Sequence, residues 1–207
     1  INELRKKKGS VTAERRLREQ GNEVGPTLVF APIKKQRLDF LIEKSVELGV
    51  ERLQPVITQH GITDKVRLDR LQSQVIEAAE QCERLTVPEV CEPVRLLDWV
   101  ANLAENHHLL FCDETGSGSP IGEVLSQLLA KGAGSVIDNI NVVNHAIVIG
   151  TEGGLSADEL ERIRKQPFAT PVSLGPRILR AETAAIAALT VFQDRIGDWS
   201  HRPVARD

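Results

Sequence analysis

A glycine-rich turn in the last third of the sequence is the strongest candidate for a ligand site. The apolar run Ala146–Ile149 leads into Gly150, and two further glycines follow at Gly153 and Gly154. Glycine has no side chain and tolerates positive φ angles, so such a turn lets a ligand approach the backbone closely. The spacing matches neither the G-x-G-x-x-G motif nor the P-loop, which disfavours dinucleotide and nucleoside triphosphate binding. From these residues alone, an ordinary tight turn is an equally good interpretation.

The residues after this turn predict the start of a helix. Ser156 and Glu159 form the S-x-x-E pattern of a capping box, which satisfies backbone N–H groups at a helix N-terminus. Ligands of parallel sheets bind beyond the carboxyl ends of the strands, which is where a turn between strand and helix lies.

A second candidate site combines a sharp turn with two arginines. A predicted strand ends at Leu174, Gly175-Pro176 reverses the chain, and Arg177 and Arg180 precede an apolar helix. Arginines before a helix N-terminus suit a phosphate or an anionic transition state.

Glu182 follows in the first turn of that helix, where a carboxylate complements the positive end of the helix dipole. The alternative is that Arg180 and Glu182 form a purely structural pair that caps the helix. The helix itself is apolar nearly all round, which implies burial either in the core or against a second subunit.

Strands and helices that would position these turns alternate from Thr27 onward. This alternation predicts an α/β fold with a mostly parallel sheet flanked by helices. Residues 131–144 are weakly patterned and are interpreted as a surface connection, while Gly49 suits the position just after a helix end. The strand candidates are Leu28–Ala31, Leu53–Ile57, His108–Cys112, Ala146–Ile149 and Pro171–Leu174. The helix candidates are Gln36–Leu48, Arg67–Arg84, Pro120–Ala130, Ser156–Lys165 and Ala181–Ile196.

The N-terminal residues 1–19 predict a hairpin around Gly9 with basic residues near its tip. A lone hairpin is marginal in water, so we expect the remnant of a small β-domain. Residues 20–26, with two glycines and a proline, predict a linker, and 27–207 predict one domain. Because the sequence starts at Ile1 and contains no methionine, we expect it to be part of a longer chain.

The overall composition is that of an ordinary soluble protein, with 41% hydrophobic and 27% charged residues. A net charge of −3 disfavours a protein whose whole surface wraps nucleic acid, although it allows a local basic patch. Cys82, Cys91 and Cys112 lack metal-ligand spacing and are interpreted as reduced thiols. No apolar stretch is long enough to span a bilayer and no secretion leader opens the sequence, so we expect a cytoplasmic protein without membrane contact.

Four separated motifs, in order, resemble the ribosomal RNA small-subunit methyltransferase E family over Thr27 to Trp199. The resemblance departs from the family pattern at Thr151, where proline is usual, and at Glu83, where glycine is usual. We expect both departures to modulate the site rather than abolish it. The motifs are Glu43–Gly49, Glu77–Arg84 with Val87-Pro88, the turn at Gly150–Gly154, and the string Leu174-Gly-Pro-Arg-Ile-Leu-Arg-x-Glu-Thr-Ala184.

The resemblance implies a SPOUT-type fold with a deep trefoil knot in its C-terminal part, a topology that is otherwise very rare. It also implies a homodimer. By the same resemblance, the N-terminal hairpin is expected to be the remnant of a PUA-like β-barrel that binds RNA. The implied cofactor is S-adenosylmethionine, held in a bent shape by the knot loops. The residues expected to hold it are Ile149, Gly150, Glu152, Gly153, Gly154, Leu174, Gly175 and Leu179.

The reaction implied by the resemblance is methylation of uridine N3 in small-subunit (16S) ribosomal RNA. N3 carries a proton in the neutral base, so the enzyme must remove it and stabilise the resulting anion. Arg180 is the candidate for that stabilisation, and Glu182 is expected to orient Arg180 rather than to accept the proton. No metal is needed, because the sulfonium supplies the electrophile. Candidates for RNA contacts, each more often a solvated charge, are Lys34, Lys35, Arg37, Lys44, Arg84 and Arg177.

Two alternatives stay open at the level of sequence. The first is a knotted methyltransferase that acts on transfer RNA or on a ribose hydroxyl, against which Glu43–Gly49 and Glu77–Arg84 argue. The second is a non-catalytic RNA-binding or ribosome assembly factor, which predicts a damaged cofactor turn. The glycines of that turn are intact.

Overall fold

The main body of the protein is built on a parallel sheet in a computed structural model that describes residues 3–5, 8–16, 19–21, 23–61, 66–104, 106–131, 144–151 and 153–201. Within these residues the sheet has eight strands, in the order β5-β4-β3-β9-β7-β10-β8, with β6 also paired to β4. The strands are β3 Thr27–Phe30, β4 Arg52–Ile57, β5 Glu89–Val90, β6 Val94–Arg95, β7 His107–Cys112, β8 Ser119–Pro120, β9 Asn144–Ile149 and β10 Ala169–Ser173. The helices are α1 Lys35–Glu47, α2 Leu68–Gln81, α3 Leu96–Ala101, α4 Ile121–Ala130, α5 Ala157–Arg164 and α6 Ala181–Arg195.

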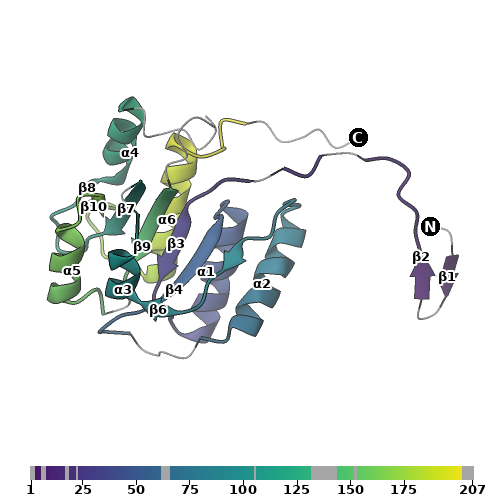
Figure 1. The fold of residues 1–207 in the computed structure, drawn as a ribbon, viewed down its shortest axis with the longest axis horizontal. Coiled ribbons are helices and arrows are strands. Elements are labelled where there is room, and N and C mark those ends of the chain that lie inside the picture. Colours follow the sequence, from purple (N-terminus) through teal and green to yellow (C-terminus); the bar gives the residue numbers. More distant parts are fainter. Residues whose placement is uncertain are drawn as a thin grey trace.

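Helices cover both faces of this sheet (Figure 1), and each face has its own hydrophobic core. Successive residues of a strand point to opposite faces. Leu28 and Ile147 therefore pack under α1, α2, α4 and α6, whereas Val29 and Val148 pack under α3 and α5. All strand pairs of the sheet are parallel. The predicted α/β fold, with a mostly parallel sheet flanked by helices, is confirmed.

The five predicted strands and five predicted helices are all present, with ends that shift by up to three residues. The short elements α3, β5, β6 and β8 were not predicted, because segments of two to six residues carry too little periodicity. Helix α6 packs against α1 and α4, so the core accounts for its apolar surface. Residues 132–143 of the predicted surface connection lie outside the described residues.

Helices α1 and α2 end in the same way, in a Schellman motif. At α1, Gly49 N–H donates to Val46 O and Val50 N–H donates to Ser45 O, at 3.0 and 3.2 Å. Gly49 has φ +77°, which confirms its predicted position.

At α2, the corresponding position after the helix is occupied by Glu83. Glu83 N–H donates to Glu80 O and Arg84 N–H donates to Ala79 O, at 3.3 and 3.0 Å. Glu83 has φ +59° and is the one non-glycine residue with positive φ in the described part of the chain. The departure from the usual glycine therefore places a side chain in the left-handed region, which glycine occupies without strain.

Near the N-terminus, β1 (Glu3–Arg5) and β2 (Lys8–Ser10) form a separate antiparallel two-stranded sheet (Figure 1). The predicted hairpin is present, but Gly9 lies within β2 rather than at the turn. Residues of the predicted linker contact the main body: Gln20 donates to Leu85 O at 2.6 Å, and Glu23 accepts from Arg84 at 2.6 Å. Among the described residues, every helix is too short or too polar to cross a membrane.

Candidate active site

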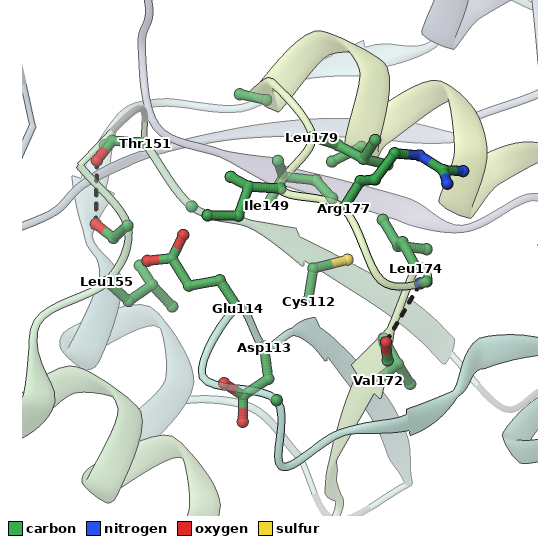
Figure 2. A pocket seen from close by; sticks show the side chains of 18 of the residues that line it. Cys112, Asp113, Glu114, Ile149, Thr151, Leu155, Val172, Leu174, Arg177 and Leu179 are labelled. Atoms are coloured by element: carbon green, nitrogen blue, oxygen red, sulfur yellow. Dashed lines mark hydrogen bonds between the residues drawn. The ribbon is translucent and has the colours of Figure 1, made fainter.

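Three neighbouring strands, β9, β7 and β10, end at one cavity of about 260 Å3 (Figure 2). Each strand is followed by a turn that forms part of the wall. The turn after β9 contributes Ile149–Thr151 and Gly154-Leu155, the turn after β7 contributes Cys112–Glu114, and the turn after β10 contributes 173–179. The first turn of α6 closes the cavity with Ala181 and Ala184. The two turns singled out in the sequence therefore enclose one space, together with a third.

The turn after β9 is closed by the side chain of Thr151. Its hydroxyl donates to Gly154 O at 3.0 Å (Figure 2) and accepts from Gly153 N–H at 3.2 Å. Gly154 N–H also donates to Thr151 O, at 3.0 Å. The threonine that departs from the family pattern is thus buried and bonded within the turn, and the turn keeps a fixed shape.

Helix α5 begins with the predicted capping box, which is confirmed. Ser156 accepts from Glu159 N–H, and Glu159 accepts from Ser156 N–H at 2.8 Å. The second carboxylate oxygen of Glu159 accepts from Gln59 N–H at 2.9 Å. The buried Glu159 therefore ties the glycine turn to the segment after β4.

The turn after β7 carries two carboxylates with different roles. Asp113 is fully buried and accepts hydrogen bonds from Ser117 Oγ and Arg164 Nη2, both at 2.5 Å, and from Thr115 Oγ1 at 2.7 Å. Burial raises the pKa of Asp113, but these hydrogen bonds outweigh it and hold the pKa well below its usual range. Asp113 is therefore ionised and fastens this turn to α5.

Glu114, the next residue, points into the cavity beside Ile149 and Leu155 (Figure 2). Its carboxylate lies against Gly154, where a Cβ atom would overlap Oε1. Gly154 also has φ +71°. This backbone conformation favours glycine, and a side chain here would also have to displace the Glu114 carboxylate.

Cys112 ends β7 and lines the same cavity. Burial raises the pKa of its thiol to about 12, so the thiol is neutral near pH 7. A neutral thiol is a poor nucleophile, and Cys112 contributes an apolar surface to the cavity.

The turn after β10 presents both of its arginines to solvent. Arg177 lines the cavity, and Arg180 is the N-cap residue of α6; both are exposed. Glu182 is buried, and its Oε1 lies 3.9 Å from Nε of Arg37 on α1. Glu182 thus pairs with Arg37, whereas no ion pair of the described residues joins it to Arg180, where the sequence led us to expect one. Within the described residues, its second oxygen has no hydrogen-bond partner.

The other basic residues predicted for RNA fall into two groups. Lys34 and Lys35 are exposed at the start of α1, on the carboxyl edge of the sheet where the cavity opens. Lys44, near the end of α1, donates to Glu43 and Glu47 at 2.6 and 2.7 Å. Arg84 has a side chain only 9% exposed. It donates to Glu23 and to the carbonyls of residues 46 and 50, so its guanidinium holds the body together at the opposite edge.

The predicted cofactor residues gather around the cavity. Gly153 lies beside this set, with its carbonyl 3.2 Å from Nδ1 of His60, and Glu152 lies outside the described residues. Sequence reasoning missed the turn after β7, although an acidic pair and two glycines after a predicted strand could have indicated it. Residues of the predicted set that line the cavity are Ile149, Gly150, Gly154, Leu174, Gly175 and Leu179.

Comparison with known proteins shows the class of protein to which this chain is similar. The family model for the RNA methyltransferase domain matches residues 21–193. Two curated relatives are named ribosomal RNA small subunit methyltransferase E: one from Buchnera aphidicola is 34% identical over 81% of this chain and 64% of its own length. The other, from Rickettsia conorii, is 33% identical over 91% of this chain and 72% of its own length. The chain belongs to the ribosomal RNA small subunit methyltransferase E family, as its motifs predicted.

A solved structure supports the same assignment. The ribosomal RNA small subunit methyltransferase E of Neisseria gonorrhoeae, bound to S-adenosyl methionine, is 29% identical with a TM-score of 0.67. The match covers 83% of this chain and 66% of that one. The present chain thus spans about two thirds of the length of several of its relatives.

Proposed function

We propose that this protein binds S-adenosylmethionine in the cavity at the carboxyl ends of β9, β7 and β10 and methylates N3 of a uridine in small-subunit (16S) ribosomal RNA. The observation that carries the proposal is the convergence of the two family motifs, after Ile149 and after Leu174, on one cavity. The solved relative from Neisseria gonorrhoeae holds S-adenosyl methionine, which supports the choice of ligand.

The lining of the cavity suits this cofactor. Its volume of about 260 Å3 lies near the lower end of the range for small-molecule sites, roughly 300–1,000 Å3. The backbone at Gly150 and Gly154 forms part of the cavity wall, and the carboxylate of Glu114 complements the positive charge of a sulfonium. Apolar surface for the adenosyl group comes from Ile149, Leu155, Leu160, Leu174 and Leu179.

The cofactor-binding residues in this proposal are those that the family motifs imply, together with one further residue that the shape of the cavity indicates. Glu114 is the addition, because Asp113, the other acidic group of the lining, is occupied by Ser117, Thr115 and Arg164. The implied residues are Ile149, Gly150, Glu152, Gly153, Gly154, Leu174, Gly175 and Leu179.

In this proposal, residues at the start of α6 act on the uridine base. When bound, the cofactor supplies an electrophilic methyl group, so the protein must expose the N3 lone pair and hold it in line. Arg180, exposed at the start of α6, stabilises the negative charge that develops as the N3 proton leaves. Glu182 has a positioning role, since it holds Arg37 of α1 beside the start of α6.

The RNA surface in this proposal is the carboxyl edge of the sheet. Arg37 lies beside Glu182 in the first turn of α6, Arg177 lines the cavity, and Lys34 and Lys35 are exposed at the start of α1. Positive charges at one edge attract the phosphate backbone of RNA, even though the net charge is −3. Lys44 and Arg84 are not part of the proposed RNA surface, because Lys44 pairs with Glu43 and Glu47 and Arg84 pairs with Glu23.

The architecture beyond the cavity follows the family. The turns after β9 and β10 belong to a deep trefoil knot, and the protein acts as a homodimer in the cytoplasm. Residues 1–19 are the remnant of a PUA-like β-barrel, 20–26 a linker, and 27–207 the methyltransferase domain.

Calorimetry with S-adenosylmethionine, joined to a turnover assay on small-subunit ribosomal RNA, tests the proposal. The wild-type chain is expected to bind the cofactor, and Arg180→Ala is expected to keep this affinity while losing turnover. A folded protein that binds no cofactor would favour a non-catalytic RNA-binding factor. Equal turnover of Arg180→Ala and wild type would remove Arg180 from the mechanism.

A further inference from the structure

A second cavity, of about 250 Å3, lies between the N-terminal halves of α1 and α2. Pro32 and Ile33, which directly follow β3, form part of its wall. Because β3 is the neighbour of β9 and parallel to it, this cavity and the proposed cofactor cavity open at the same edge of the sheet.

The walls of the second cavity combine an apolar interior with a basic rim. The apolar part consists of Pro32, Ile33, Leu38, Val66 and Leu71. The rim carries Lys35, Arg67 and Arg70, of which Arg70 is paired with Asp39 and Arg67 with Asp69. RNA-binding proteins stack unpaired bases on planar groups such as the arginine guanidinium, and here Arg67 and Arg70 stand beside an apolar interior.

Gln74 on α2 adds a polar group to the wall of the second cavity. Its Oε1 atom is buried, and within the described residues nothing donates a hydrogen bond to it. Buried amide oxygens are nearly always hydrogen-bonded, so one that is not calls for a ligand or another explanation. A glutamine side chain can pair with adenine through two hydrogen bonds, accepting from the N6 amino group with its oxygen and donating with its nitrogen.

The second cavity lies along the basic edge that leads to the proposed cofactor cavity. Helix α1 separates the two, and Arg37 on α1 contacts Glu182 on α6. Exposed Lys34 and Lys35 lie at the start of the same helix. An RNA strand whose target uridine enters the first cavity would follow these cations toward the second.

We infer that the cavity between α1 and α2 binds an adenine of the substrate RNA close to the target uridine. The apolar walls contact the faces of the base, Gln74 reads its amino group, and Lys35 and Arg67 contact its phosphate. This inference rests on the proposed function and names one sequence-reading element of its RNA substrate.

The test uses 16S ribosomal RNA transcripts in which purine riboside, which lacks the N6 amino group, randomly replaces adenosine. Protein-bound RNA is separated from unbound RNA. The positions at which purine riboside is absent from the bound RNA, called excluded positions, are then mapped. RNA bound by the wild-type protein is expected to lack purine riboside at one adenosine near the target uridine. With Gln74→Met this exclusion is expected to vanish, and the affinity for unmodified RNA is expected to fall about tenfold.

Gln72→Met is the matched control, because Gln72 lies exposed on the same helix outside the cavity. It is expected to leave the exclusion pattern and the affinity unchanged. Gln74→Met is also expected to keep the thermal midpoint and the affinity for S-adenosylmethionine. A lower midpoint with an unchanged exclusion pattern would assign Gln74 a structural role and overturn the inference. The same exclusion pattern in wild type and Gln74→Met would overturn it as well, whereas failure of the proposed function would appear as absent cofactor binding in the wild type.

Discussion

Gly154 and Glu114, which lie 40 residues apart in the sequence, contact each other across the proposed cofactor cavity: the Glu114 carboxylate occupies the space that any side chain at position 154 would need. The contact joins the turn after β9 to the turn after β7. A side chain at position 154 would displace the Glu114 carboxylate, so this part of the cavity wall depends on both turns.

Replacement of Gly154 by alanine is therefore expected to damage the cofactor site. The new methyl group meets the Glu114 carboxylate, and alanine at φ +71° is strained. Affinity for S-adenosylmethionine, measured by calorimetry, is expected to fall more than about tenfold, which is about 1.4 kcal/mol. Gly122→Ala is the control, since Gly122 lies on α4 outside the cavity lining and a Cβ there meets only an ordinary contact with Val191 at 3.8 Å. Equal losses in the two variants would argue against the Gly154–Glu114 contact.

Glu114→Gln is expected to separate charge from shape. The amide keeps the size of the side chain but loses the negative charge beside the sulfonium. Affinity for S-adenosylmethionine is expected to fall about tenfold, or about 1.4 kcal/mol. Affinity for the neutral thioether product is expected to stay within about twofold, because that molecule lacks the sulfonium charge. If the variant binds both ligands as the wild type does, Glu114 does not face the sulfonium.

Much of this arrangement followed from the sequence, because its signals are local. Apolar runs, helix periodicity and the S-x-x-E pattern at Ser156 predicted the elements, and the glycine turn and the Arg177–Arg180 segment predicted two walls of the cavity. The third wall was not predicted, since its role depends on the strand order, which places β7 between β9 and β10. The Arg37–Glu182 contact joins residues 145 positions apart, and no local pattern reports such a pair.

Asp113→Asn is expected to lower stability in a pH-dependent way. The pKa of Asp113 lies well below its usual range in the folded protein. The stabilisation that ionised Asp113 gives the folded state is therefore fully present above the pKa of this group in the unfolded chain, about 3.9. It is lost as the pH falls through the pKa in the folded protein. At pH 7 the free energy of unfolding in urea is expected to drop by about 1.5–3 kcal/mol, because the hydrogen bonds to the buried Asp113 carboxylate lose their charge.

The difference between wild type and Asp113→Asn should stay constant from pH 7 to about pH 5 and shrink below about pH 4. Asp158→Asn is the control, since Asp158 forms an exposed ion pair with Arg162 on the same helix as Arg164. Its effect is expected to stay below about 1 kcal/mol. A difference for Asp113→Asn that grew with falling pH would contradict the assignment of an ionised, hydrogen-bonded Asp113.

Glu83→Gly is expected to stabilise the protein by about 0.5–1 kcal/mol, because glycine adopts the positive φ of the Schellman motif without strain. Thermal or urea unfolding measures the gain. Glu83→Ala keeps the strain and is expected to give no comparable gain, while Gly49→Ala, at the same position of the α1 motif, is expected to destabilise. A Glu83→Gly variant no more stable than Glu83→Ala would mean that the backbone conformation is not the source of the effect.

The proposed reaction places a methyl group on N3 of a uridine in small-subunit ribosomal RNA. Nucleoside mass spectrometry of that RNA, from cells with and without the gene, tests this reaction most directly. One 3-methyluridine is expected to disappear when the gene is deleted, and to return when the wild-type gene, but not the Gly154→Ala variant, is restored. Retention of every 3-methyluridine in the deleted cells would rule the reaction out.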